Sequence, residues 1–168
     1  LRALGTSVRC SRRSLSSPGA DLVFDSTAGL IPTSGDLDGI THLLSTIPPT
    51  TEGHDPVLTH LGSQLKEQSL TWVGYLSTTG VYGDQQGRWV SEDDPANPGQ
   101  PRSQRRHACE QAWLDSGLPV QILRLPGIYG PGRSVLDSLR AEKARRILKA
   151  DQVFCRIHVD DIAGACLH

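Results

Sequence analysis

Short apolar runs alternate with segments of helical spacing along most of the chain, and this alternation restricts the fold more than any other feature. The runs have the length and the apolar content of strands. They are TSVRCS (6–11), ADLVFD (20–25), ITHLLST (40–46), TWVGYLST (71–78), PVQILRL (119–125) and VFCRIHV (153–159). Strands that alternate with helices predict an α/β fold with a parallel sheet covered on both faces.

Two of the intervening segments have clear helical signals. DPVLTHLGSQLKEQ (55–68) carries apolar residues at helical intervals, namely Val57, Leu58, Leu61 and Leu65. Ser103 is predicted to cap a second helix, which runs to about Ser116 and stops at Gly117.

The last third of the chain is predicted to contain two further helices and a tight loop. One helix is expected from Val135 to Leu148, and Asp160 or Asp161 is expected to cap the other. The glycine-rich stretch GIYGPGR (127–133) is predicted to form the loop.

Composition narrows the class of protein. The 168 residues suit one domain, expected to span 1–168, and the net charge of -1 argues against a nucleic-acid partner. No apolar run approaches the roughly 20 residues of a membrane span. The four cysteines form no CxxC pair and have no zinc spacing, so reduced thiols and no metal are expected. We expect a cytoplasmic protein, or a plastid stromal one in a photosynthetic eukaryote.

The beginning of the sequence allows two interpretations. The chain starts at Leu1 and contains no methionine, so we expect that its natural start lies upstream. Residues 1–20 are rich in Arg and Ser and have no acid before Asp21, which is also the composition of a transit peptide. The α/β pattern that follows favours the alternative: the end of a helix (LRAL), a turn at Gly5 and a strand.

Three motifs in a fixed order resemble one family. They are STTGVYGD (77–84), LRLPGIYGPGR (123–133) and RIHVDDIAGA (156–165). Together they are similar to the extended short-chain dehydrogenase/reductases, the NAD(P)-dependent epimerase/dehydratase group, in an atypical branch. The resemblance covers the chain from about Leu4. It implies a Rossmann-like, doubly wound parallel sheet with the cofactor across the carboxyl ends of the strands.

The same resemblance assigns a role to the first motif. In the family, a Ser or Thr four residues before the tyrosine of Val-Tyr-Gly hydrogen-bonds the reacting oxygen of the substrate. The tyrosine here is Tyr82, so Thr78 is the expected catalytic hydroxyl. A hydroxyl can donate and accept as a carbonyl becomes an alcohol. The alternative is that Ser77, Thr78 and Thr79 only satisfy backbone groups at the strand end.

The family's catalytic Tyr and Lys are replaced. Counting back from Glu110, which matches a glutamate of the family's helix, the Lys position holds Arg106 and the Tyr position holds Arg102. An arginine stays charged, so it cannot shuttle a proton, although Arg106 could still bind a ribose or phosphate. Tyr82, Tyr129 and His107 are possible substitutes, but packing explains such tyrosines as readily.

The cofactor-binding signals are incomplete. The glycine-rich fingerprint of these folds is missing, and with it the first strand, which we expect to lie upstream. At the end of the second family strand stand Arg12 and Arg13, with no acid nearby, which favours NADP over NAD. A basic turn facing solvent is the alternative. Ile47 and Pro48 match a family loop along the adenosine side of the cofactor.

Two functions remain open from the sequence. The first is an NAD(P)-dependent oxidoreductase or epimerase whose substrate is a small carbonyl compound or a sugar nucleotide. The second is a nucleotide-binding or scaffold protein that has lost the catalytic Tyr/Lys pair. The sequence gives no oligomeric state.

Overall fold

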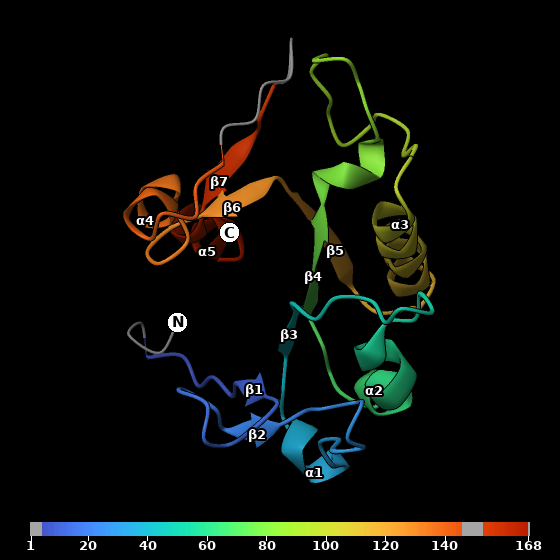
Figure 1. Ribbon diagram of the computed structural model, residues 1–168. Coiled ribbons are helices and arrows are strands. Elements are labelled where there is room, and N and C mark those ends of the chain that lie inside the picture. Colours follow the sequence, from blue (N-terminus) through green and yellow to red (C-terminus); the bar gives the residue numbers. More distant parts are fainter. Residues whose placement is uncertain (1–4, 146–152, 168) are drawn as a thin grey trace.

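The computed structural model describes residues 5–145 and 153–167, whose strands form three groups with parallel pairing (Figure 1). The strands are β1 (Ser11–Arg12), β2 (Leu22–Val23), β3 (His42–Ser45), β4 (Trp72–Thr78), β5 (Val120–Leu125), β6 (Gly127–Tyr129) and β7 (Arg156–His158). The helices are α1 (Ser34–Leu37), α2 (Pro56–Lys66), the 3-10 helix η2 (Thr79–Tyr82), α3 (Pro101–Leu114), α4 (Val135–Arg140) and α5 (Val159–Ala165). The predicted parallel α/β architecture is confirmed.

The central sheet has the order β3–β4–β5. Its register pairs Ser45 with Tyr75 and Thr78 with Leu125. Because the strands are parallel, their carboxyl ends point to the same edge. Figure 1 shows α2 and α3 on one side of this sheet. On the opposite face Leu44 is 41% exposed, so the helical cover of the described residues is on one face.

The core lies between the central sheet and its two helices. Its buried members are Phe24, Leu37, Val57, Leu61, Leu65, Val73, Tyr75, Cys109 and Trp113. Three residues of the predicted helical face belong to this core, and the fourth, Leu58, packs against it. The helical period in residues 55–68 therefore predicted both the helix and the side that it buries.

Asp55 joins α2 to the core. It caps the helix, since its Oδ1 accepts hydrogen bonds from the backbone N–H groups of Val57 (2.9 Å) and Leu58 (3.0 Å). Its Oδ2 accepts one from the indole of Trp113 at 3.0 Å. Burial raises the pKa of Asp55 above the ordinary value, against the opposing effect of these donors. One carboxyl thus fixes the start of α2 against α3.

The β1–β2 pair is a separate small element. β1 begins at Ser11, so the strand predicted at residues 6–11 is wrong in extent. The backbone N–H groups of Asp21 and Leu22 both bond to the carbonyl of Cys10, and β1 and β3 do not pair with each other within the described residues. Within the described residues, β1 thus pairs with β2 on one side only, and it is two residues long.

β6, β7, α4 and α5 form the third group, which Figure 1 shows on the side of the central sheet away from α3. The predicted loop at residues 127–133 is partly wrong, because its first half is β6 and pairs with β7. The turn is confined to Gly130–Arg133, where the two residues exchange backbone hydrogen bonds. α4 ends at Arg140, well before the predicted Leu148, as the N–H groups of residues 143 and 144 turn back to the carbonyl of Ser138. Residues 146–148 of that predicted helix, like the predicted helix end at 1–4, lie outside the described residues.

Two predicted helix caps are wrong. α3 begins at Pro101 with Gln100 as its N-cap, because proline suits the first turn, so Ser103 lies inside the helix and is buried. α5 is capped by His158, whose Nδ1 accepts from the N–H of Asp160 at 3.3 Å, and both predicted caps lie in its first turn. None of the helices in the described part of the chain is long and apolar enough to cross a membrane.

Candidate functional site

Thr78 stands at the carboxyl end of β4 and starts the turn that follows it. Its Oγ1 accepts a hydrogen bond from the backbone N–H of Gly80 at 3.2 Å and so caps η2. The Thr78 hydroxyl therefore does satisfy a backbone group at the strand end, as the alternative interpretation predicted. A hydroxyl that accepts one bond still has its own proton to donate. The half-buried Thr78 can thus cap the turn and bind a ligand oxygen at the same time.

Gly80 is required by the close approach of η2 to α3. A β-carbon at Gly80 would lie 2.8 Å from Oγ of Ser103, which real β-carbons do not tolerate. Ser103 is buried and in the first turn of α3, so the first turn packs directly on the turn after Thr78. Nearby, Ser77 is also buried, and its hydroxyl has no hydrogen-bond partner among the described residues. The hydroxyl residues of the motif therefore differ: Ser77 is buried without a hydrogen-bond partner among the described residues, whereas Thr78 accepts a bond from Gly80.

Arg106 crosses from α3 to the carboxyl ends of two strands. Its Nη1 lies 3.1 Å from the carbonyl oxygen of Leu76, 3.1 Å from the hydroxyl of Tyr75 and 3.5 Å from the carbonyl oxygen of Ile47. Its guanidinium carbon lies 5.5 Å from the centre of the Tyr75 ring. Leu76 lies two positions before Thr78 on β4. The structure therefore brings three predicted site residues, Ile47, Thr78 and Arg106, to one edge of the sheet.

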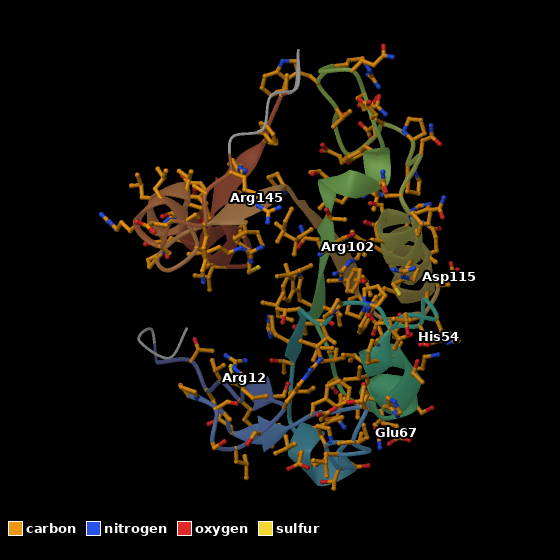
Figure 2. All side chains as sticks on the ribbon, viewed as in Figure 1. Arg12, His54, Glu67, Arg102, Asp115 and Arg145 are labelled. Carbon is orange, nitrogen blue, oxygen red and sulfur yellow. The ribbon has the colours of Figure 1, made fainter. Side chains whose placement is uncertain are left out.

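Arg102, in the family's tyrosine position, is exposed at the start of α3 (Figure 2). It makes no ion pair within the described part of the chain. A guanidinium that faces solvent keeps its charge at any working pH. The side chain at this position can attract an anion but cannot supply a proton.

The tyrosines of the chain each have a packing role. Tyr75 is fully buried against Trp113, and burial raises its pKa far above the ordinary value. Tyr82 is 6% exposed and its ring lies under the guanidinium of Arg124, 4.8 Å away. Tyr129 contacts His158 edge to face in the β6–β7 group. Of the three, Tyr129 is the one with a solvent-exposed ring.

Cys109 and His107 on α3 are likewise engaged. The thiol of Cys109 is 3.3 Å from the carbonyl oxygen of Gly53, and burial raises its pKa to about 11. It is therefore a protonated thiol at neutral pH and a poor nucleophile. All four cysteines are free. The Nδ1 of His107 lies 3.4 Å from a carboxylate oxygen of Glu110.

A buried ion pair joins α3 to β5, and sequence reasoning did not find it. Glu110 is fully buried, and Arg124 contacts both of its carboxylate oxygens, with the shortest distance 2.8 Å from Nη2. This hydrogen bonding raises the pKa of Arg124 further above its ordinary value. The available signal was a single arginine inside the apolar strand VQILRL. Through its contact with Tyr82, the pair also supports η2.

Arg12 and Arg13 lie on another part of the molecule. Figure 2 shows Arg12 with the β1–β2 pair, far in the view from Arg102. No hydrogen bond or ion pair within the described residues links either arginine to Thr78 or Arg106. In space, however, an acid does lie near: Asp25, two residues after β2, is close enough for Arg13 to help lower its pKa, after the larger effect of the Thr27 hydroxyl.

Two surface hollows lie away from Thr78. One, of about 240 Å³, is lined by Gly53, Asp55 and Cys109 among others, on the helical side of the sheet. The other, of about 370 Å³, lies beside β2 and is lined mainly by apolar residues, including Leu22 and Leu30. Neither includes a predicted site residue.

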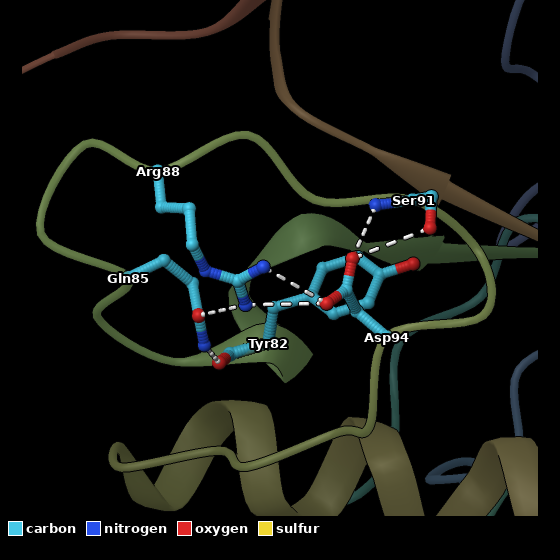
Figure 3. Close-up of polar contacts among 5 residues, drawn as sticks. All are labelled: Tyr82, Gln85, Arg88, Ser91 and Asp94. Carbon is cyan, nitrogen blue, oxygen red and sulfur yellow. Dashed lines mark hydrogen bonds and ion pairs between the residues drawn. The ribbon is translucent and has the colours of Figure 1, made fainter.

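The loop after η2 is tied down by polar contacts (Figure 3). Gln85 donates to the carbonyl of Tyr82 at 2.6 Å and accepts from Arg88 at 2.8 Å. Arg88 also pairs with Asp94 at 3.1 Å, and Asp94 accepts from the N–H of Ser91 at 2.7 Å. These contacts give the polar loop at residues 84–100, between η2 and α3, a fixed internal order.

Two known proteins are similar to this chain in sequence. A protein from Silicibacter pomeroyi DSS, described as functionally unknown and conserved, is 41% identical, with a TM-score of 0.85 over 98% of this chain and 60% of that one. Protein YeeZ of Escherichia coli K12 is 34% identical over 93 residues, which are 54% of this chain and 32% of YeeZ. This chain therefore spans less than two thirds of the length of either protein. No family model matches it.

Two further solved structures are similar to this chain, and their descriptions name a function or the bound ligands. A Methylobacillus flagellatus protein assigned as an NAD-dependent epimerase/dehydratase is 27% identical, with a TM-score of 0.70 over 99% of this chain and 62% of that one. MoeE5, solved with UDP-glucose and NAD, is 21% identical, with a TM-score of 0.75 over 99% of this chain and 64% of that one. The predicted resemblance is confirmed: the structural neighbours of this chain are epimerase/dehydratase-type proteins with the Rossmann fold, matched over part of their length.

The ion pair between Glu110 and Arg124 gives a test of the site's architecture. Arg124→Leu leaves the buried Glu110 carboxylate with the 3.4 Å contact to His107 but without its arginine partner, so we expect the free energy of unfolding to fall by about 3–5 kcal/mol. The double variant Glu110→Leu with Arg124→Leu removes both charges and should recover most of that loss. Urea unfolding measures both. As a control, Arg140→Leu removes an exposed pair with Asp137 and should change stability by about 0.5 kcal/mol or less. A double variant no more stable than Arg124→Leu would contradict this account.

Proposed function

We propose that this chain supplies part of an NAD(P)-dependent site that oxidises, reduces or epimerises a small carbonyl or sugar-nucleotide substrate. The observation that carries the proposal is the position of Thr78 at the carboxyl end of β4, where its Oγ1 caps η2 and its hydroxyl donates to no acceptor among the described residues. Ligands of doubly wound folds bind outside the carboxyl ends of the strands. A hydroxyl donor at that edge can stabilise negative charge that develops on a substrate oxygen.

The proposed cofactor is NADP. MoeE5 was solved with NAD, which supports a dinucleotide in this fold but not the choice between the two. Arg12 and Arg13 favour the 2′-phosphate of NADP, since guanidinium groups bind phosphate oxygens in pairs. The proposed adenosine side includes Ile47 and Pro48. The cofactor itself would supply the hydride chemistry.

Only part of the Arg106 guanidinium would be available to bind the cofactor, because its Nη1 already bonds to the protein. One nitrogen of its guanidinium is occupied by the oxygens of Ile47, Tyr75 and Leu76. An arginine has further donors on Nε and Nη2, and these would face a ribose or phosphate. Arg106 therefore holds the strand ends in place and offers its remaining donors to the ligand.

A second function is favoured by one specific observation. Arg102 and Arg106 replace the family's proton donor and its lysine partner, and the buried Tyr75 and Tyr82 are committed to packing. A protein that binds the nucleotide without turning it over needs only the positive charges and the strand edge. Nucleotide binding without turnover would support this second function.

Thr78→Val tests the catalytic role at nearly constant volume. If the hydroxyl stabilises the transition state, kcat should fall by about 10²–10³-fold, as for the loss of one such donor. Cofactor affinity should stay within about twofold. Thr79→Val is the matched control, because it changes the neighbouring hydroxyl of the same motif. Activity is measured as NADPH oxidation across carbonyl and sugar-nucleotide substrates. Equal rates for Thr78→Val and Thr79→Val would exclude the proposed role.

The cofactor choice is tested by calorimetry. One charge-assisted pair contributes about 1.5–3 kcal/mol, so NADPH should bind at least about tenfold more tightly than NADH. The joint replacement of Arg12 and Arg13 by Ala should remove that preference and leave NADH affinity nearly unchanged. Arg9→Ala, on the same segment, is the control. Equal affinities of the unaltered protein for the two cofactors would refute the NADP assignment.

A further inference from the structure

The N-cap of α5 is a histidine. The ring Nδ1 of His158 accepts a hydrogen bond from the backbone N–H of Asp160 at 3.3 Å. The residues that usually cap helices are Ser, Thr, Asp and Asn, whose oxygens are acceptors at and around neutral pH. A ring nitrogen accepts a hydrogen bond only while it carries no proton. This cap therefore requires a neutral imidazole with its proton on Nε2.

The capped end of α5 is closely packed against β6 and the turn that follows it. A β-carbon at Gly130 would lie 2.7 Å from Cγ1 of Val159 and 3.7 Å from Nε2 of His158. Tyr129 is the partner of His158 in the β6–β7 register, and the two rings meet edge to face with their centres 5.0 Å apart. His158 thus links the first turn of α5 to both strands of this group (Figure 1).

A carboxylate beside the ring can bind its charged form. Oδ2 of Asp160 lies 3.5 Å from the same Nδ1, and the Asp160 side chain is 85% exposed. An imidazolium carries a proton on both nitrogens, so charging turns Nδ1 from an acceptor into a donor. In the charged state Nδ1 donates to the carboxylate of Asp160, and the backbone N–H of Asp160 loses its cap.

The other charged groups around the ring act in both directions. Asp161 lies with Asp160 in the first turn of α5, and both carboxylates favour a charged ring. Arg156 precedes His158 by two residues on the same face of β7, and its guanidinium packs on β6, so it disfavours that charge. Arg133, in the turn after β6, is exposed. The helix N-terminus also disfavours a cation, and an exposed ion pair contributes little stability, so pairing with Asp160 does not replace the cap.

We propose that His158 is a pH-sensitive cap, which holds the start of α5 when the imidazole is neutral and releases the first turn of the helix when it is charged. Histidine side chains change charge between about pH 8 and pH 5. The two states differ in the partner of one atom, since Nδ1 binds the Asp160 N–H in the first and the Asp160 carboxylate in the second. The switch involves the β6–β7 group alone and is independent of the proposed cofactor and substrate.

Proton–nitrogen NMR of the 168-residue chain between about pH 8 and pH 5 tests the switch without any variant. At the upper pH we expect the His158 ring to carry its proton on Nε2. On acidification the backbone amide of Asp160 should shift with the same midpoint as the ring. A proton on Nδ1 at the upper pH, or an Asp160 amide that does not follow the ring, would overturn the proposal.

Hydrogen exchange measures the release of the helix in the same samples. The reporter is the amide of Cys166, which bonds to the carbonyl of Ile162 at 3.1 Å. Its protection factor should fall by about 2- to 30-fold between the two ends of the pH range, which corresponds to the loss of one helix cap. Equal protection at both ends would contradict the release of α5.

His158→Asn separates the switch from other effects of pH. Asparagine caps helices and carries no charge, so the protection of Cys166 in this variant should be the same at both ends of the pH range. His54→Asn removes an exposed histidine before α2 and is the matched control, in which the pH response should be unchanged. A response that persists in His158→Asn, or one that disappears in His54→Asn, would refute the role of His158. If His158→Asn does not fold, the tautomer and the Asp160 titration of the unaltered chain still decide.

Discussion

The contacts of Arg106 hold together the part of the fold on which the candidate site depends. One guanidinium nitrogen links α3 to the carbonyl oxygens at the ends of β3 and β4 and to the hydroxyl of Tyr75. Hydrogen bonds from a charged donor contribute about 1.5–3 kcal/mol each, and more is lost when buried acceptors are left without a partner. Within the described residues, this crosslink is the side-chain polar contact between the loop after β3 and the end of β4 that carries Thr78.

A second contact of α3 extends this arrangement. Glu110 binds Arg124 on β5, and Arg124 lies over Tyr82 at the end of η2. The helix is thus bonded through Arg106 to β4 and to the loop after β3, and through Glu110 to β5. Arg106, which replaces the lysine of the family's pair, therefore has a structural role in the folded chain. This explains how a helix can keep its place in the fold when the Tyr/Lys pair of the family is absent.

The sequence predicted the order of the elements because hydrophobic period is a local property. The helix at 55–68 and the strand at 71–78 were both recognisable from spacing and composition alone. Helix starts were less accurate: Ser103 was taken as a cap, but Pro101 starts the helix and tertiary packing buries the serine. The strand at 127–129 was missed because its pairing partner is almost thirty residues further along the chain, so no local signal exists.

The candidate site was less accessible to sequence reasoning than the fold. Thr78 and Arg106 were found through motif positions, and folding does bring their segments together. The ion pair of Glu110 with Arg124, and the approach of Asp25 to Arg13, depend on contacts between elements that are separate in sequence. The cap formed by His158 was missed, because histidine is not among the residues that usually cap helices.

We propose that a nucleotide binds at the carboxyl edge of β3 and β4, where Arg106 holds the two strand ends. A two-dimensional NMR titration of the chain with NADPH tests it most directly, since it detects even millimolar binding and reports on each backbone amide. We expect the largest shifts at Ile47 and at Thr78 to Gly80, and we expect Arg106→Ala to abolish them while the spectrum stays that of a folded protein. Shifts confined to the β6–β7 group, or shifts at Thr78 that are unchanged in Arg106→Ala, would contradict it.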